Sequence, residues 1–195
     1  MENTRRAAYG KLLGRLEEPI REVVPALWDL PFVMDTGFTC SGHILREPDG
    51  ILGKRPDFGG YIWYPHRAML ELAFSHDEAL VTARDAFRRD LAAVAVEVDG
   101  LALGFNAGHA FDQEFLPYSR IPDPNLSENY NAVLPEVPRE ESSVIRVETL
   151  LTAFWEAVAA VVRRHSPNAK IGPIAGKNFR SRKNWDHWPL SGQEK

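Results

Sequence analysis

The chain has 195 residues, 44% of them hydrophobic and 26% charged, a composition that suits one globular domain with a sizeable core. Its formal net charge of -4 argues against non-specific nucleic-acid binding, which needs a net basic surface, although a local basic patch remains compatible with it. The single cysteine, Cys40, excludes an internal disulfide and a zinc site built from several cysteines.

Neither a signal peptide nor a membrane span is expected. The residues after Met1–Arg6 mix polar and apolar types, and no run approaches the roughly 20 apolar residues that a spanning helix needs. We therefore expect a cytoplasmic protein with no membrane partner.

The first part of the chain is expected to be helical. Apolar residues recur at three- or four-residue steps between Ala8 and Leu27, which is the period of one helix face. Pro19 interrupts this pattern and predicts a break near Glu18. After the helix we expect a strand over 32–38, a turn over 39–43, a loop over 46–60 and a second strand over 61–64.

The middle of the chain is expected to hold two helices and a hairpin. A short helix is expected over 66–74 and a longer one over 76–92, because Ser75 and Glu78 have the spacing of a capping box. Asp99-Gly100 separates two alternating apolar runs and is typical of a type I′ turn. These residues predict a β-hairpin over about 93–107.

The last third is expected to combine an irregular segment, a long helix and a polar tail. Residues 117–141 contain five prolines and little periodicity, which is typical of a lid, an interface or a disordered loop. Apolar residues from Val144 to Val161 predict a helix over about 143–165. We expect one α+β domain over 1–169, with helices packed on one side of a mostly antiparallel or mixed sheet, and a polar C-terminal tail over 170–195.

The candidate catalytic residues lie near the only cysteine. Cys40 and His43 are three residues apart, so thiol and imidazole could bind a metal or form an activated thiolate. His66 and His109 each follow an expected strand, and together with His43 they could complete a catalytic zinc site if those strands are neighbours. A buried structural cysteine with histidines at strand ends is the competing interpretation.

The expected turn is also a candidate binding site. Thr39, Ser41 and Gly42 combine hydroxyl groups with a residue that permits close backbone approach, so the turn could present N–H groups to a carboxylate or phosphate. An ordinary β-turn explains the same residues equally well. Tyr61 and Trp63 share one face of the expected second strand, where they could stack on a flat ring or pack in the core.

The expected tail carries a basic run. Lys177, Arg180, Arg182 and Lys183 are interleaved with aromatic residues, a composition that suits phosphate contact with base stacking. RNA is therefore a possible partner of this run, and a solvated tail is the alternative.

Cys40-Ser41-Gly42 resembles part of the Ser-Ser-Cys-Ser-Gly-Arg motif of the tRNA wybutosine-synthesising methyltransferases, and Gly59-Gly60, Trp63 and His66 follow in a similar context. This family modifies a guanosine-derived base in phenylalanine tRNA and uses S-adenosylmethionine. Phe38 and Thr39 stand where the family has two serines, and His43 stands where it has an arginine. The resemblance covers about residues 20–66.

Three functions remain open. The resemblance implies an enzyme, or a relative of one, that binds S-adenosylmethionine or another nucleotide-like ligand between residues 39–43 and 61–66. The histidines alone suggest a metal-dependent or His-assisted hydrolase. A non-catalytic interaction domain would instead use the proline-rich segment over 117–138 or the tail.

Overall fold

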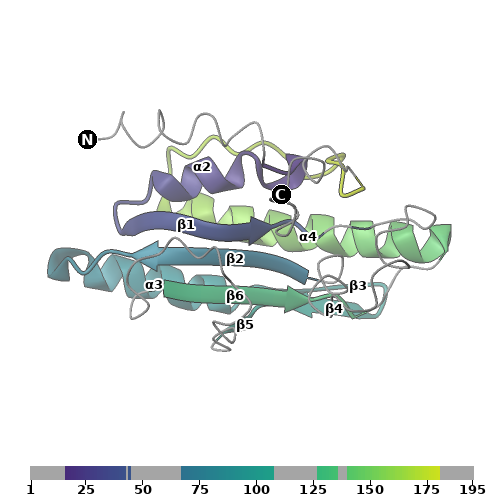
Figure 1. Ribbon diagram of the computed structural model, residues 1–195, viewed down its shortest axis with the longest axis horizontal. Helices are drawn as coiled ribbons and strands as arrows, with labels where there is room; N and C mark the ends of the chain where they lie inside the picture. Colours follow the sequence, from purple (N-terminus) through teal and green to yellow (C-terminus); the bar gives the residue numbers. More distant parts are fainter. Residues whose placement is uncertain (1–15, 43, 45–66, 108–126, 136–139, 181–195) are drawn as a thin grey trace, which may run out of the picture.

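The computed structural model describes residues 16–42, 44, 67–107, 127–135 and 140–180. Its main sheet has four antiparallel strands in the order β1-β2-β6-β5, which are β1 (Val33–Cys40), β2 (Arg67–Phe74), β6 (Ser127–Val133) and β5 (Asn106–Ala107). Strand β2 pairs with β1 on one side and with β6 on the other, so it lies inside the sheet (Figure 1).

The predicted hairpin is confirmed. Strands β3 (Ala95–Val98) and β4 (Leu101–Gly104) pair antiparallel, and Asp99 and Gly100 between them have φ angles of 51° and 75°. Both positive angles are those that a type I′ turn requires. The hairpin is the second, two-stranded sheet, and strand β5 follows it directly and joins the main sheet, so the chain passes from one sheet into the other at this point.

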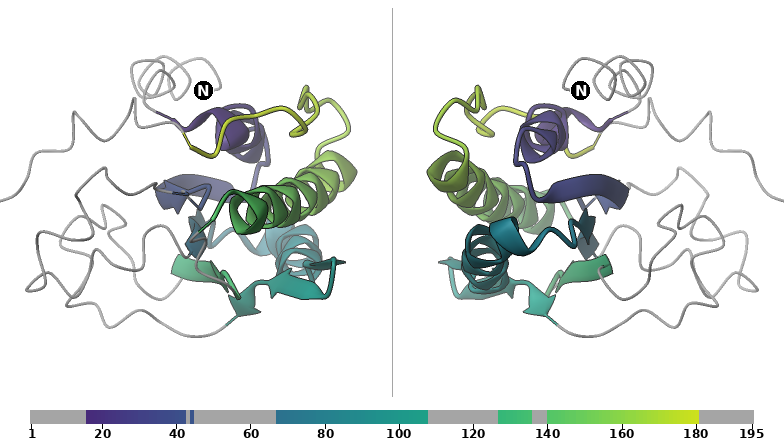
Figure 2. Two further views of the ribbon diagram at one scale, coloured as in Figure 1. Left: turned by 90° about the vertical axis from the view of Figure 1, so that its right-hand side faces the viewer. Right: turned by 90° about the vertical axis from the view of Figure 1, so that its left-hand side faces the viewer.

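The helices lie on one side of the main sheet (Figure 2). They are the short helices η1 (Glu18–Ile20), α2 (Val23–Trp28) and η3 (Glu78–Leu80), and the longer α3 (Val81–Ala92) and α4 (Glu141–His165). A buried apolar cluster fills the space between them and the sheet, with Trp155 and Phe154 of α4 fully buried in it. The predicted α+β class, with antiparallel strands and helices on one side, is confirmed.

The predicted helix over 66–74 is wrong, because residues 67–74 form strand β2. Ala68, Met69, Leu70, Glu71 and Leu72 have high helix propensity, and this local preference favoured a helix. Their neighbours on both sides are strands, and residues Ala68–Phe74 are all buried. Strand pairing and burial on both faces outweigh a propensity difference of a few tenths of a kcal/mol per residue.

The irregular segment predicted over 117–141 is also partly wrong, because it contains strand β6. The run Asn129-Tyr130-Asn131 gives little apolar signal, since its asparagines are polar and rare in strands. Tyr130 and Ala132 nevertheless face the core and are almost completely buried. The strand forms because β2 offers a complete ladder of seven paired residues.

Two helix starts differ from expectation. The predicted Ser75–Glu78 capping box is wrong. Asp77 caps the helix, because its Oδ1 accepts from the Ala79 N–H at 2.9 Å, and Ser75 Oγ accepts from the Asp77 N–H at 3.1 Å.

The long C-terminal helix is confirmed and begins at Glu141, two residues earlier than expected. The predicted break near Glu18 agrees with the two short helices η1 and α2, and Pro19 lies in the first turn of η1.

A polar network joins α3 to the sheet. Arg88 donates to Glu128 Oε1 from Nε at 2.7 Å, and the buried Tyr130 hydroxyl donates to the other oxygen of Glu128. Burial, followed by the hydrogen bond to Glu128, raises the pKa of Tyr130, so its phenol stays protonated and remains a donor. The hydrogen bond to Glu128 likewise raises the pKa of Arg88.

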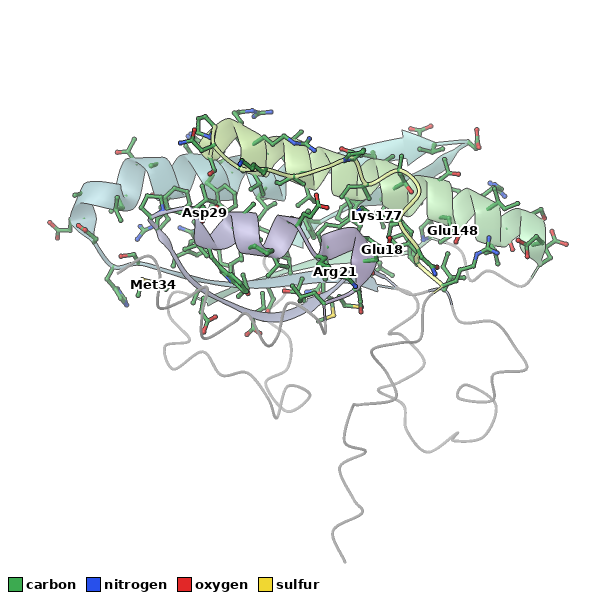
Figure 3. The ribbon with its side chains drawn as sticks, turned by 90° about the horizontal axis from the view of Figure 1, so that it is seen from above. Glu18, Arg21, Asp29, Met34, Glu148 and Lys177 are labelled. Carbon is green, nitrogen blue, oxygen red and sulfur yellow. The ribbon has the colours of Figure 1, made fainter. Side chains whose placement is uncertain are left out.

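Residues 171–180, called here the C-terminal segment, pack onto the domain although the sequence places them in a polar tail. Ile171, Ile174 and Phe179 are buried members of the core cluster. In Figure 3 the segment crosses from α4 to the first helices, with Lys177 near Glu18. The tail residues described here therefore contribute apolar side chains to the same core as the helices.

Glutamate side chains, and not a neighbouring strand, accept the backbone hydrogen bonds of this segment. Glu22 accepts from the Gly172 N–H, Glu156 from the Ile174 N–H at 2.5 Å, and Glu18 from the Asn178 N–H at 3.3 Å. The hydrogen bond from Gly172, with a further contribution from Lys177, lowers the pKa of Glu22 below its ordinary value of 4.5. The carboxylates therefore satisfy backbone N–H groups that would pair with a neighbouring strand if the segment lay at the edge of a sheet.

Acidification should loosen the C-terminal segment. Because the pKa of Glu22 is lowered by folding, its stabilising contribution is fully present above pH 4.5 and is lost as the pH falls through the folded-state pKa. Hydrogen exchange at Gly172, corrected for the intrinsic rate, should show protection falling over that range. Glu22→Gln should weaken the protection at neutral pH, whereas Glu97→Gln, on the exposed side of β3, should leave it unchanged.

No helix of the described residues is both long enough and apolar enough to cross a membrane.

Candidate functional site

The candidate site begins inside strand β1. Thr39 and Cys40, which were expected in a turn, are still paired with β2, opposite Leu70 and Met69 respectively. Gly42 has a φ of 83°, a left-handed conformation that glycine adopts without strain. The strand therefore runs two residues further than expected, and the left-handed Gly42 follows it after Ser41.

The backbone of Ser41 is held by hydrogen bonds on both sides. Its N–H donates to Glu17 Oε2 at 2.5 Å, and its carbonyl accepts from Trp155 Nε1 at 2.8 Å. Ser41 is fully buried, and the indole of Trp155 is buried as well. The Ser41 N–H is thus already used within the fold, and the end of β1 is fixed between the N-terminal region and α4.

The C-terminal segment also reaches this site. The Ile44 N–H donates to the Phe179 carbonyl at 3.2 Å, and both side chains are buried. Arg180, the next residue, pairs with Glu148 of α4 through two hydrogen bonds, one of them 2.6 Å long. The residues on both sides of position 43 are therefore positioned by contacts from distant parts of the chain.

Two hydroxyl groups of the site are buried without a partner among the described residues. These are Thr39 Oγ1 and Ser41 Oγ. Thr36, on the same strand, provides the contrast, because its Oγ1 accepts from Trp28 Nε1 at 2.9 Å. An unpaired buried polar atom costs about 1–3 kcal/mol, so native proteins keep few of them and often keep them for a function.

Most of the other predicted site residues cannot be placed. His43, His66, His109, Tyr61 and Trp63 lie outside the described residues, so their convergence stays a prediction. Within the part of the chain that the structure describes, no three or more histidine, cysteine, aspartate or glutamate side chains are arranged to hold a metal ion. Cys40 is buried and not in a disulfide.

The basic run divides into two parts. Lys177 Nζ lies 3.3 Å from Glu22 Oε1, and Arg180 pairs with Glu148 and Glu141. The hydrogen bond to Glu148 contributes most to raising the pKa of Arg180. These two cations therefore hold the fold together, while Arg182 and Lys183 lie outside the described residues.

Sequence reasoning missed four residues that shape this region. Glu17 and Trp155 hold Ser41, and Glu71 and Asn131 are buried polar residues on β2 and β6. Polar residues at buried positions are a useful signal only once the strands are known, and neither of these strands was predicted. Glu17 and Trp155 are separated from Ser41 by 24 and 114 residues, and no local pattern marks them.

Comparison of the chain with protein-family models, with curated proteins and with solved structures found no match.

Paired substitutions on β1 should separate structural hydroxyls from unpartnered ones. Thr36→Val leaves the Trp28 N–H without its acceptor and should lower the free energy of unfolding by about 1 kcal/mol. Thr39→Val removes a buried oxygen that has no partner among the described residues, so stability should stay the same or rise. Urea denaturation of the parent and of both variants measures the free energy of unfolding. An equal decrease in both variants would contradict the expected difference between the two hydroxyl groups.

Proposed function

We propose that this chain is an enzyme, or a relative of an enzyme, resembling the tRNA wybutosine-synthesising methyltransferases. It binds S-adenosylmethionine or another nucleotide-like ligand beside residues Thr39–Gly42. The observation that supports the proposal is the Ser41 side chain, whose hydroxyl is buried and without a partner among the described residues while its backbone is fixed on both sides.

The arrangement suits a reaction that depends on positioning. Transfer of a methyl group needs donor and acceptor held in line, and correct placement alone accounts for a large part of the rate of such reactions. The backbone of Ser41 is held by Glu17 and Trp155, so a ligand would need to order only the Ser41 side chain and not the strand end that carries it. The ligand would supply the hydrogen-bond partners that Thr39 Oγ1 and Ser41 Oγ lack.

The resemblance extends the proposal to a tRNA substrate in the cytoplasm. Within the basic run, Lys177 and Arg180 are engaged in ion pairs with glutamates, so the run would contact RNA phosphates through Arg182 and Lys183. Two phosphate contacts from this run would add only a small part to the dependence of RNA affinity on salt concentration.

Calorimetric titration with S-adenosylmethionine tests the proposal directly. The parent chain should bind the ligand, and Ser41→Ala should bind it about fivefold more weakly, as expected for one lost hydrogen bond. Ser41→Ala keeps the backbone bonds to Glu17 and Trp155, so its thermal stability should equal or exceed that of the parent.

Ser142→Ala is the matched control. Ser142 is exposed at the start of α4, where its hydroxyl donates to Glu140, so its removal should not change ligand affinity. Absence of binding at millimolar S-adenosylmethionine would exclude this ligand. Equal affinity in Ser41→Ala and the parent would show that the buried hydroxyl is not a ligand contact.

A further inference from the structure

The start of helix η1 holds both the end of β1 and the C-terminal segment through two adjacent glutamates. Glu17 accepts from the Ser41 N–H at 2.5 Å. Glu18, the next residue, accepts from the Asn178 N–H at 3.3 Å. Figure 3 shows the C-terminal segment reaching this helix, with Lys177 near Glu18. Because one planar peptide bond joins the two glutamates, a displacement of either contact affects the other.

Two adjacent residues of helix α4 make an equivalent pair of contacts. The Trp155 indole donates to the Ser41 carbonyl at 2.8 Å. Glu156, the next residue, accepts from the Ile174 N–H at 2.5 Å. Ser41 and the C-terminal segment are therefore held by neighbouring residues at two separate places in the fold.

One hydrogen bond joins the C-terminal segment to the end of the first strand directly. The Ile44 N–H donates to the Phe179 carbonyl at 3.2 Å. Ile171, Ile174 and Phe179 also belong to the buried apolar cluster that contains Ile44 and Trp155. If the segment left the domain, this cluster would lose three buried members, so the support around Ser41 depends on a docked segment.

The C-terminal segment is attached through side chains, which makes it easier to release than a paired strand. Its residues lie outside the helices and strands of the described chain. Side chains of other elements bond its backbone, namely those of Glu18, Glu22, Glu156 and Arg163. Its cations Lys177 and Arg180 make partly exposed ion pairs, which salt screens. Such a segment opens locally at a lower free energy than the ladder of a sheet.

We propose that the C-terminal segment is a conformational latch for the end of β1. While the segment is docked, Glu17, Trp155 and Ile44 keep Ser41 in its observed position. When the segment opens, these contacts loosen together, so the fraction of molecules with an ordered candidate site falls. One consequence rests on the proposed function, because a ligand bound at Ser41 would in turn favour the docked segment.

Native-state hydrogen exchange in the full chain tests the latch without a ligand. The Ser41 and Gly172 amides should open with the same free energy, and both should exchange faster than the Leu72 amide of strand β2. Ile174→Val removes one buried methyl group from the segment and should raise both rates about fivefold, while the Ala79 amide keeps its rate. A Ser41 rate that stays constant while the Gly172 rate rises, or that equals the Leu72 rate, would overturn the proposal.

Glu156→Ala and Asp77→Ala are a matched pair of variants, because each removes a carboxylate that accepts from a backbone N–H group. Glu156→Ala should raise the exchange rates of Gly172 and Ser41 about tenfold, as expected for the loss of a charge-assisted hydrogen bond. Asp77→Ala should accelerate Ala79 and leave Gly172 and Ser41 unchanged. Faster exchange at Ser41 in Asp77→Ala, or no change at Gly172 in Glu156→Ala, would contradict the latch.

Exchange measured with S-adenosylmethionine separates failure of the latch from failure of the proposed function. At about ten times its dissociation constant, the ligand should slow exchange at Gly172 in the parent chain about tenfold, because opening then requires loss of the ligand. The Ala79 amide should keep its rate. Coupled exchange without ligand binding would support the latch and exclude this ligand, whereas binding that leaves the Gly172 rate unchanged would exclude the latch alone.

Discussion

The hydrogen bond from the Trp155 indole to the Ser41 carbonyl joins the middle of the longest helix to the end of the first strand. Both groups are buried, and 114 residues separate them in the chain. Because the indole N–H would otherwise be unpaired in the core, this bond favours the observed position of helix α4 relative to the end of β1. The position of the candidate site therefore depends on a contact made inside the core.

Carboxylates fix the backbone on the other sides of this contact. Glu17 accepts from the Ser41 N–H, and Glu18, Glu22 and Glu156 accept from backbone N–H groups of the C-terminal segment. Charge-assisted bonds of this kind are stronger than bonds between neutral groups, and they satisfy backbone that has no strand neighbour. As a result the segment stays close to the core and brings the Phe179 carbonyl to Ile44.

The two faces of the main sheet differ in composition. One face packs against the helices, with Leu70, Leu72 and Tyr130 in the core cluster. The other carries Glu71 and Asn131 at buried positions, which costs free energy unless each polar group is paired. Strand β1 contributes to both faces, because Thr39 is paired with Leu70 of the core face and Cys40 is paired with Met69 of the other.

The sequence alone determined those features that depend on neighbouring residues. Asp99-Gly100 specified the hairpin because both residues tolerate positive φ, and the regular apolar spacing from Val144 to Val161 specified α4. Strands β2 and β6 were decided only by the tertiary structure, since helix-favouring residues in one and asparagines in the other become strands by pairing with each other. The candidate site divides in the same way. Thr39–Gly42 are visible in the sequence, but the burial of Ser41 and the hydrogen bonds that Glu17 and Trp155 make to its backbone arise from contacts between segments far apart in the chain.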